Sequence, residues 1–206
     1  MGNWLSRFDR RARVPSDLNT PWFNRRVFML SRHLAAAIPG RGTVLMVGAG
    51  DGRIARALMR LRPDLHVEGA DIDPPPHTLV PVARDEGTAL PWTDKNFDYA
   101  VLVDALSGFA DPSAMLAEAG RVAREGVVVK DHQREGWLAG PTLRLIARSG
   151  DGGGGFLSRR EWEGAFFKAR LELLSSVDRL DLHLPPGRWL FDRRLHFVAY
   201  LTPKGG

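Results

Sequence analysis

Short apolar runs alternate along the chain with segments in which apolar residues recur every three or four positions. The runs cover residues 43–48, 65–71, 97–103 and 127–130 and are rich in valine, leucine and aromatic residues, as strands buried on both faces are. Between these runs, apolar residues every three or four positions indicate helices that pack one face against a sheet. The alternation predicts an α/β fold with a mostly parallel sheet covered on both faces.

Turn and cap residues mark the ends of the predicted helices. The first helix follows Thr20-Pro21 and stops before position 39, and the second covers the segment between the glycines near position 50 and Pro63. A third helix follows Asp111-Pro112, with Gly126 at the position of a C-cap. The sequence at 158–161 is a capping box for a fourth helix. Residues 171–177 and 195–202 are predicted as the last two strands.

The composition excludes several classes of protein. The chain has 206 residues, 44% of them hydrophobic, and no cysteine. The cysteine count excludes a disulfide framework, thiolate zinc sites, iron–sulfur clusters and a cysteine nucleophile, and it fits a cytoplasmic location. No apolar run approaches the ~20 residues of a membrane-spanning helix. We expect a basic N-terminal arm over residues 1–20 and a single domain over residues 21–206.

The excess of positive over negative charge lies at the start of the chain. Residues 1–40 hold seven arginines against Asp9 and Asp17, a balance of 7 − 2 = +5, which is the whole net charge. A nucleic-acid-binding body with basic residues throughout is therefore disfavoured. Trp4, Leu5 and Phe8 in this arm could contact a membrane surface or cover a pocket of the protein itself.

The most informative segment is the glycine-rich turn at residues 48–53, between the first predicted strand and the second helix. Glycine allows positive φ and a close approach of a ligand to the backbone, and the following helix offers free N–H groups. Asp71 ends the next strand, 21 residues after Gly50. That is where a carboxylate binds the two ribose hydroxyls of an adenosine.

The turn favours S-adenosylmethionine over NAD. A dinucleotide site needs a third glycine at position 53, which is arginine here, and the carboxylate of Asp51 would repel a pyrophosphate. The amino-acid part of S-adenosylmethionine suits such a turn better, because Asp51 can hold its ammonium group.

Three segments together resemble the class I S-adenosylmethionine-dependent methyltransferases, and most of all the branch with the ubiquinone and menaquinone biosynthesis enzymes. The segments are VLMVGAGDGRIA, VEGADIDP and ALPWTDKNFDYAVLVDALSGFADP, and the similarity extends from about residue 43 to 131. The resemblance implies a doubly wound, seven-stranded Rossmann-like sheet in the order 3-2-1-4-5-7-6. It also implies an antiparallel final strand.

The resemblance assigns roles to particular residues around S-adenosylmethionine. It implies that the turn contacts the methionine part, that Asp71 holds the ribose, and that Ile72 lies against the adenine. Glu86 is the best positional match for the acid that binds the adenine amino group, and Asp85 is its competitor. The full implied set is Gly48, Ala49, Gly50, Asp51, Gly52, Asp71, Ile72, Glu86, Gly87, Thr88, Asp104, Ala105 and Leu106, the last three at the methyl-donor end.

The sequence departs from the family between Asp71 and Glu86. Only 14 residues separate them, and three are the consecutive prolines at 74–76. Prolines remove N–H donors and push the preceding residue out of the helical region. We therefore expect the second crossover to be trimmed to a loop with a short strand near residues 79–82.

The acceptor side is expected after the strand at 127–130. Methyl transfer is an in-line displacement that needs positioning and, for a poorly ionised acceptor, a general base. His132 is the first candidate for that base and Asp131 the second, although either could be a solvated turn or cap residue. The other histidines show no metal-ligand spacing, so no metal is expected.

We therefore expect S-adenosylmethionine-dependent methyl transfer to a small-molecule acceptor. Three alternatives stay open. An RNA or protein methyltransferase would use the arginine-rich arm, although the chain lacks an N/D-P-P-Y/F element. A non-catalytic module that keeps the fold would act through a partner surface. An NAD-dependent oxidoreductase is the third alternative, and Arg53 argues against it.

Overall fold

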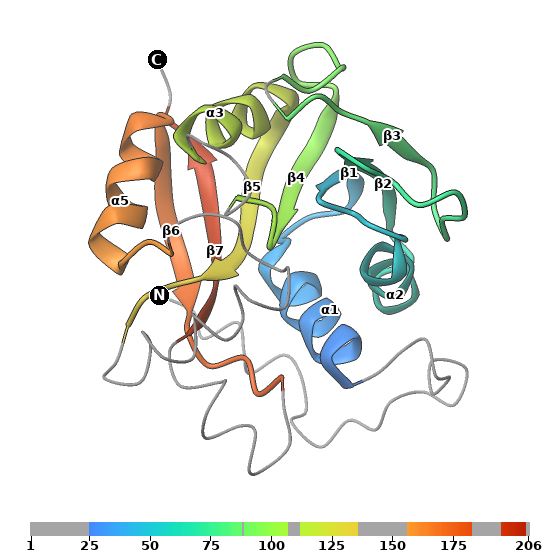
Figure 1. Ribbon diagram of the computed structural model, residues 1–206, viewed down its shortest axis with the longest axis horizontal. Helices are drawn as coiled ribbons and strands as arrows, with labels where there is room; N and C mark the ends of the chain where they lie inside the picture. Colours follow the sequence, from blue (N-terminus) through green and yellow to red (C-terminus); the bar gives the residue numbers. More distant parts are fainter. Residues whose placement is uncertain (1–24, 88, 107–111, 136–155, 183–194, 205–206) are drawn as a thin grey trace.

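Seven strands form one twisted sheet with helices on both faces (Figure 1). The computed structural model describes residues 25–87, 89–106, 112–135, 156–182 and 195–204. The strands are β1 (Gly42–Val47), β2 (Leu65–Asp71), β3 (Val82–Arg84), β4 (Phe97–Val103), β5 (Ala123–His132), β6 (Leu171–Val177) and β7 (His196–Pro203). The helices are α1 (Arg25–Ala37), α2 (Arg53–Leu61), α3 (Pro112–Val122) and α5 (Arg159–Lys168). The α/β fold class predicted from the sequence is confirmed.

The strand order is β3-β2-β1-β4-β5-β7-β6, the order that the family resemblance implies. Strands β1 to β5 run parallel to one another, and β7 runs antiparallel to its neighbours β5 and β6. The carboxyl ends of β1, β2, β4 and β5 therefore meet at one edge of the sheet, where open α/β sheets bind ligands. No helix in the described ranges is long and apolar enough to span a membrane.

Two hydrophobic cores lie on opposite faces of the sheet because strand side chains alternate. Val44 and Met46 belong to the core under α1 and α2. Leu45 and Val47 belong to the core under α3 and α5. The same alternation in β5 puts Val128 on the α1 face and Val127 and Val129 on the α5 face.

The second crossover lacks a helix, as the prolines predict. The chain leaves β2 at Asp71, and Gly69 donates its N–H to the carbonyl of Pro81 (2.8 Å) before the short β3 begins. Strand β3 has only three residues and begins at Val82, slightly later than expected. A loop of this kind leaves the outer end of the sheet without a covering helix after β2 (Figure 1).

The predicted C-cap at Gly126 is wrong. Helix α3 ends at Val122 and β5 begins at the next residue, so Gly126 lies inside the strand and pairs with Tyr99. Its role is steric, because a Cβ there would lie 2.6 Å from the ring of Tyr200. The glycine therefore permits close strand packing rather than ending a helix.

Strand β5 extends beyond the predicted 127–130 at both ends, and β1 and β7 are each shifted by one residue from the predicted 43–48 and 195–202. The Ser158 hydroxyl accepts a hydrogen bond from the N–H of Glu161, and the Glu161 carboxylate accepts one from the N–H of Ser158 (2.6 Å), so the capping box is confirmed. The first helix is described from Arg25 onward. The N-terminal arm and its aromatic residues lie outside the described residues, as do Asp111, Thr88 and the glycine-rich segment at 149–155.

Candidate functional site

The glycine turn connects β1 to α2 at the carboxyl edge of the sheet. Gly48, Gly50 and Gly52 have φ angles of 74°, 53° and 79°, the left-handed region that only glycine adopts at no cost. The N–H groups of Gly48 and Ala49 bond to the carbonyl of Ala70, which ties the turn to β2. A Cβ at Gly50 would meet no atom of the described residues within 4 Å, so the middle of the turn is open on that side of the described structure.

Gly48→Ala is expected to lower the free energy of unfolding by about 3 kcal/mol, from left-handed strain and crowding together. The added Cβ would lie 2.8 Å from the Cβ of Ala105 and 3.1 Å from the carbonyl of Val103. Denaturant unfolding measures the change. Gly164→Ala in α5, where the added Cβ would meet no described atom within 4 Å, is the matched control and should be neutral or slightly stabilising. Equal effects of the two changes would contradict the packing argument.

Asp71 is attached to the glycine turn. Its Oδ2 accepts a hydrogen bond from the N–H of Gly50 (2.7 Å), and its Oδ1 accepts one from the N–H of Asp73 (3.0 Å). An ionised carboxylate has about four acceptor positions, so the contacts with described residues leave two for a ligand. The neighbouring Ile72 is 50% exposed, an apolar surface beside the carboxylate.

The Asp51 carboxylate contacts the first residue of the helix that follows it, α2. Its carboxylate forms an ion pair with Arg53 (Oδ2 to Nε 2.6 Å) and accepts the N–H of Arg53 (3.2 Å). Its carbonyl accepts the N–H of Leu79 (2.9 Å), which attaches the crossover loop to the turn. Asp51 therefore accepts the first N–H of α2 as well as lying in the turn, while Gly52 is the N-cap residue.

The two candidate acids after β3 differ in burial. Glu86 is exposed, whereas Asp85 is 3% exposed. Asp85 Oδ1 accepts the N–H of Gly87 (2.7 Å), and its Oδ2 has no hydrogen-bond partner among the described residues. Burial raises the pKa of Asp85 above its ordinary value. A buried carboxylate oxygen without a partner is a position where a donor from a ligand would be stabilised.

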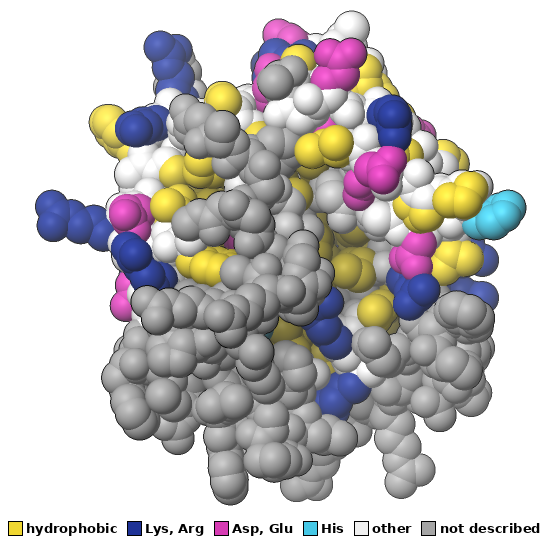
Figure 2. Space-filling view, viewed as in Figure 1, with side chains coloured by type: hydrophobic (Ala, Val, Ile, Leu, Met, Phe, Trp, Pro, Cys, Tyr) yellow, Lys and Arg dark blue, Asp and Glu magenta, His cyan; other side chains and the backbone are white. Residues whose placement is uncertain are grey.

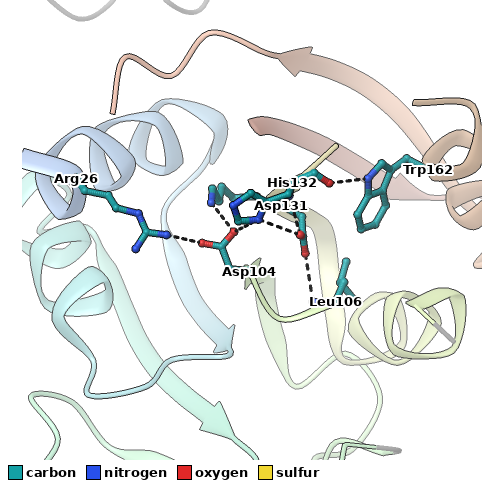
Figure 3. A network of polar contacts seen from close by, with 7 residues as sticks. Arg26, Asp104, Leu106, Asp131, His132 and Trp162 are labelled. Atoms are coloured by element: carbon teal, nitrogen blue, oxygen red, sulfur yellow. Dashed lines mark hydrogen bonds and ion pairs between the residues drawn. The ribbon is translucent and has the colours of Figure 1, made fainter. Parts of the chain in front are cut away.

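Asp104 follows β4 and lies at the centre of a polar cluster (Figure 3). Its Oδ1 forms an ion pair with Lys130 of β5, and its Oδ2 accepts a hydrogen bond from Arg26 of α1 (3.0 Å). Burial alone would raise the pKa of Asp104, but the charges of Lys130, His132 and Arg26 hold it far below its ordinary range. Asp104 also has a φ of 51°, a strained conformation for a non-glycine residue.

His132 ends β5 beside this carboxylate. Its Nδ1 lies 3.2 Å from Oδ1 of Asp104, and its carbonyl accepts the indole N–H of Trp162 (3.0 Å). Burial alone would lower the pKa of His132, but the nearby carboxylates of Asp104 and Asp131 outweigh burial and raise it. With Nδ1 facing the carboxylates, Nε2 is the nitrogen that can accept a proton.

Asp131 connects the ends of β4 and β5. Its Oδ2 accepts the N–H of Leu106 (3.2 Å), and its Oδ1 accepts the N–H of His132 (2.7 Å). It is 1% exposed, whereas the side chain of Asp104 is 20% exposed. Asp131 is thus placed to fix the backbone that carries His132.

Asp104, Asp131 and His132 offer three potential metal-ligand atoms within 4.8 Å of one another. Lys130 and Arg26 already neutralise Asp104, and a divalent cation would have to displace a buried ammonium group. The cluster is therefore better described as an ion-pair network than as a metal site.

The structure adds three residues that sequence reasoning missed. Arg26 comes from α1, Lys130 from the interior of β5, and His196 from β7, where its ring centroid lies 4.5 Å from that of His132. Burial lowers the pKa of His196 well below its ordinary value, and the charge of Lys130 lowers it further. One local signal existed, a lysine inside an otherwise apolar strand.

A cavity of about 210 Å³ lies away from this cluster, between α5 and the β6–β7 hairpin. Trp162, Phe166 and Phe197 are among its lining residues. It opens on the α5 face of the sheet. Lys130 and His132 lie two and four residues after Val128 in β5, so their side chains share its α1 face.

Comparison with known proteins agrees with this geometry. Residues 45–129 match a family model described as a methyltransferase domain. No curated protein matches the chain in sequence.

Solved structures share the fold. A chain from the complex between the Haloferax volcanii Trm112 methyltransferase activator and a protein described as a methyltransferase is 18% identical, with a TM-score of 0.68 over 87% of this chain and 91% of that chain. A Thermotoga maritima protein described as an S-adenosylmethionine-dependent methyltransferase is 21% identical, with a TM-score of 0.61 over 89% and 93%. The [4+2]-cyclase SpnF is 17% identical, with a TM-score of 0.63 over 86% and 81%. The chain therefore has the Rossmann-like class I methyltransferase fold.

Proposed function

We propose that this protein transfers a methyl group from S-adenosylmethionine to a hydroxyl group of a small molecule. The observation that carries the proposal is the joint position of the glycine turn, Asp71 and the Asp104–His132 pair at one sheet edge. The first two would hold the nucleoside and amino-acid parts of the cofactor, and the third would serve the acceptor.

The described residues fit the proposed cofactor. The turn faces open space at Gly50, the half-exposed Ile72 offers an apolar surface for adenine, and Asp71 keeps two acceptor positions for ribose hydroxyls. For the adenine amino group we propose Asp85 rather than Glu86. The buried Oδ2 of Asp85 needs a donor, whereas Glu86 is exposed.

His132 is the proposed general base, and Asp104 orients it. Nδ1 of His132 faces Asp104, so Nε2 takes the proton that the acceptor oxygen loses. When bound, S-adenosylmethionine supplies a methyl group: the acceptor oxygen bonds to the methyl carbon, the carbon–sulfur bond breaks, and sulfur keeps the electron pair. His132 gains one positive charge as the sulfonium charge disappears, so the total charge of the site is unchanged. A base at this position is needed only for an acceptor hydroxyl that arrives protonated.

Asp71→Ala is expected to weaken binding of S-adenosylmethionine and S-adenosylhomocysteine by about 100-fold, because the carboxylate serves both the ligand and the N–H of Gly50. Calorimetric titration measures the affinities, with NAD as the competing cofactor. Asp73→Ala is the matched control, since the Asp73 carboxylate is exposed and pairs only with Arg84 in the described contacts. Absence of S-adenosylmethionine binding by the unaltered protein would remove the proposed function and favour a non-catalytic scaffold.

A further inference from the structure

Asp104 pairs with two cations, and Asp131 is a second carboxylate in the same cluster. Lys130, which has no exposed surface, pairs with Oδ1, and Arg26 pairs with Oδ2. Lys130 alone balances the charge of the Asp104 carboxylate itself. The two cations differ in freedom, because Lys130 is enclosed by the sheet whereas the Arg26 side chain is 45% exposed. A ligand could therefore take over Arg26 while Lys130 continues to neutralise Asp104.

Arg26 lies at the part of the site where the acceptor is expected. A Cβ added at Gly48 would touch Ala105, the residue after Asp104, so the glycine turn and the Asp104 cluster adjoin each other. Figure 3 shows Arg26 reaching from α1 to Asp104 on one side, with His132 on the other side of the same carboxylate. The guanidinium group and the proposed base thus flank Asp104.

The guanidinium of Arg26 keeps donors for a ligand. Within the described part of the chain it uses only Nη2, in the contact with Asp104. The planar fork of arginine matches a carboxylate with two parallel hydrogen bonds. Figure 2 shows Lys and Arg side chains on the surface over α1.

We infer that Arg26 binds a carboxylate on the methyl acceptor and so selects hydroxy acids over uncharged hydroxyl compounds. The inference rests on the proposed methyl transfer and adds the substrate class. A single guanidinium suits one carboxylate, whereas a phosphate group usually meets several cations, and the neighbouring Arg25 bonds instead to the carbonyl of Asp181 (3.2 Å). Phe156, whose ring centroid lies 5.7 Å from that of His132, gives the acceptor side an aromatic neighbour.

The test compares acids with their amides. Protein saturated with S-adenosylhomocysteine is titrated calorimetrically with 2-, 3- and 4-hydroxybenzoate and with the three matching hydroxybenzamides. At least one acid is expected to bind at least about tenfold more tightly than its amide, the preference typical of a charge-assisted pair. Arg26→Gln should remove this ratio, and Arg26→Lys should keep part of it. Arg25→Gln, which removes the same charge one residue away, should leave the ratio unchanged.

Three results would overturn the inference: no acid binds, acids and amides bind alike, or Arg25→Gln lowers the ratio as much as Arg26→Gln. Because the ratio is read within each variant, a general loss of affinity cannot imitate a loss of selectivity. Failure of the unaltered protein to bind S-adenosylhomocysteine would instead count against the proposed function. The two failures are therefore distinguishable.

Discussion

His132→Gln is expected to lower kcat for methyl transfer by about 100- to 10,000-fold, the usual contribution of a positioned general base. Glutamine keeps a polar side chain of similar size but cannot take a proton near neutral pH. The affinity for S-adenosylhomocysteine should change little, because His132 is not among the residues proposed to hold the cofactor. Counting transferred radioactive methyl groups under saturating cofactor measures the rate.

The pH profile gives this prediction a second readout. Burial would lower the pKa of His132, but the carboxylates of Asp104 and Asp131 beside its Nδ1 outweigh burial and raise the pKa above the ordinary value of 6.5. The neutral imidazole is the active form, so kcat should rise with pH through a midpoint above 6.5. That midpoint should be missing from the profile of His132→Gln.

His66→Gln is the matched control, because His66 lies on β2 with its side chain 69% exposed. It should change neither kcat nor the pH profile. A His132→Gln protein with unchanged kcat would show that the acceptor needs no base at this position and would end the assignment.

Lys130→Met is expected to lower the free energy of unfolding by about 3 kcal/mol, because it removes the buried counter-ion of Asp104. The value lies at the low end for a broken buried pair, since Arg26 and His132 still face the carboxylate. Methionine nearly matches the length of lysine, so the loss would come from charge and not from a cavity. Denaturant unfolding followed by circular dichroism measures the change.

A double-mutant cycle separates the ion pair from its surroundings. Asp104→Asn alone should also destabilise the fold, because it leaves the Lys130 ammonium group buried without its counter-ion. The double variant should lose clearly less than the sum of the two single changes. Lys168→Met on the exposed surface of α5 is the control and should stay within about 0.5 kcal/mol. Additive losses would contradict the pairing.

Much of the fold could be predicted from the sequence where one local pattern dominates. The bounds of β2, β4 and β6 equal the predicted ranges, because each is a compact run between turn residues. The trimmed crossover followed from three prolines. The prediction at Gly126 was wrong because a glycine after a helical pattern can either end the helix or allow close packing inside a strand. The contact with Tyr200 shows that it does the second, and Tyr200 is 74 residues away in the chain.

The part of the candidate site that lies at strand ends could also be predicted from the sequence. The glycine turn, Asp71 and Asp104 all follow parallel strands, so the topology alone brings them to one edge. Arg26 and His196 reach the site from α1 and from an antiparallel strand, and no local spacing relates them to Asp104. The choice between Asp85 and Glu86 likewise depended on burial, which no sequence rule assigns to one of two adjacent acids. The functional roles of all these residues stay predictions.

The direct junction between Val122 and Ala123 has a consequence for how the chain can change in evolution. No loop separates α3 from β5. The register between β4 and β5 shifts near the start of β5, so that β5 already has one more residue than β4 between the pairs at Phe97 and Tyr99. An inserted or deleted residue there would shift the strand by one and turn each side chain to the opposite face. Lys130 would then leave Asp104 and face α5. Length variation among descendants of this chain should therefore be confined to other segments, while this junction keeps a constant number of residues.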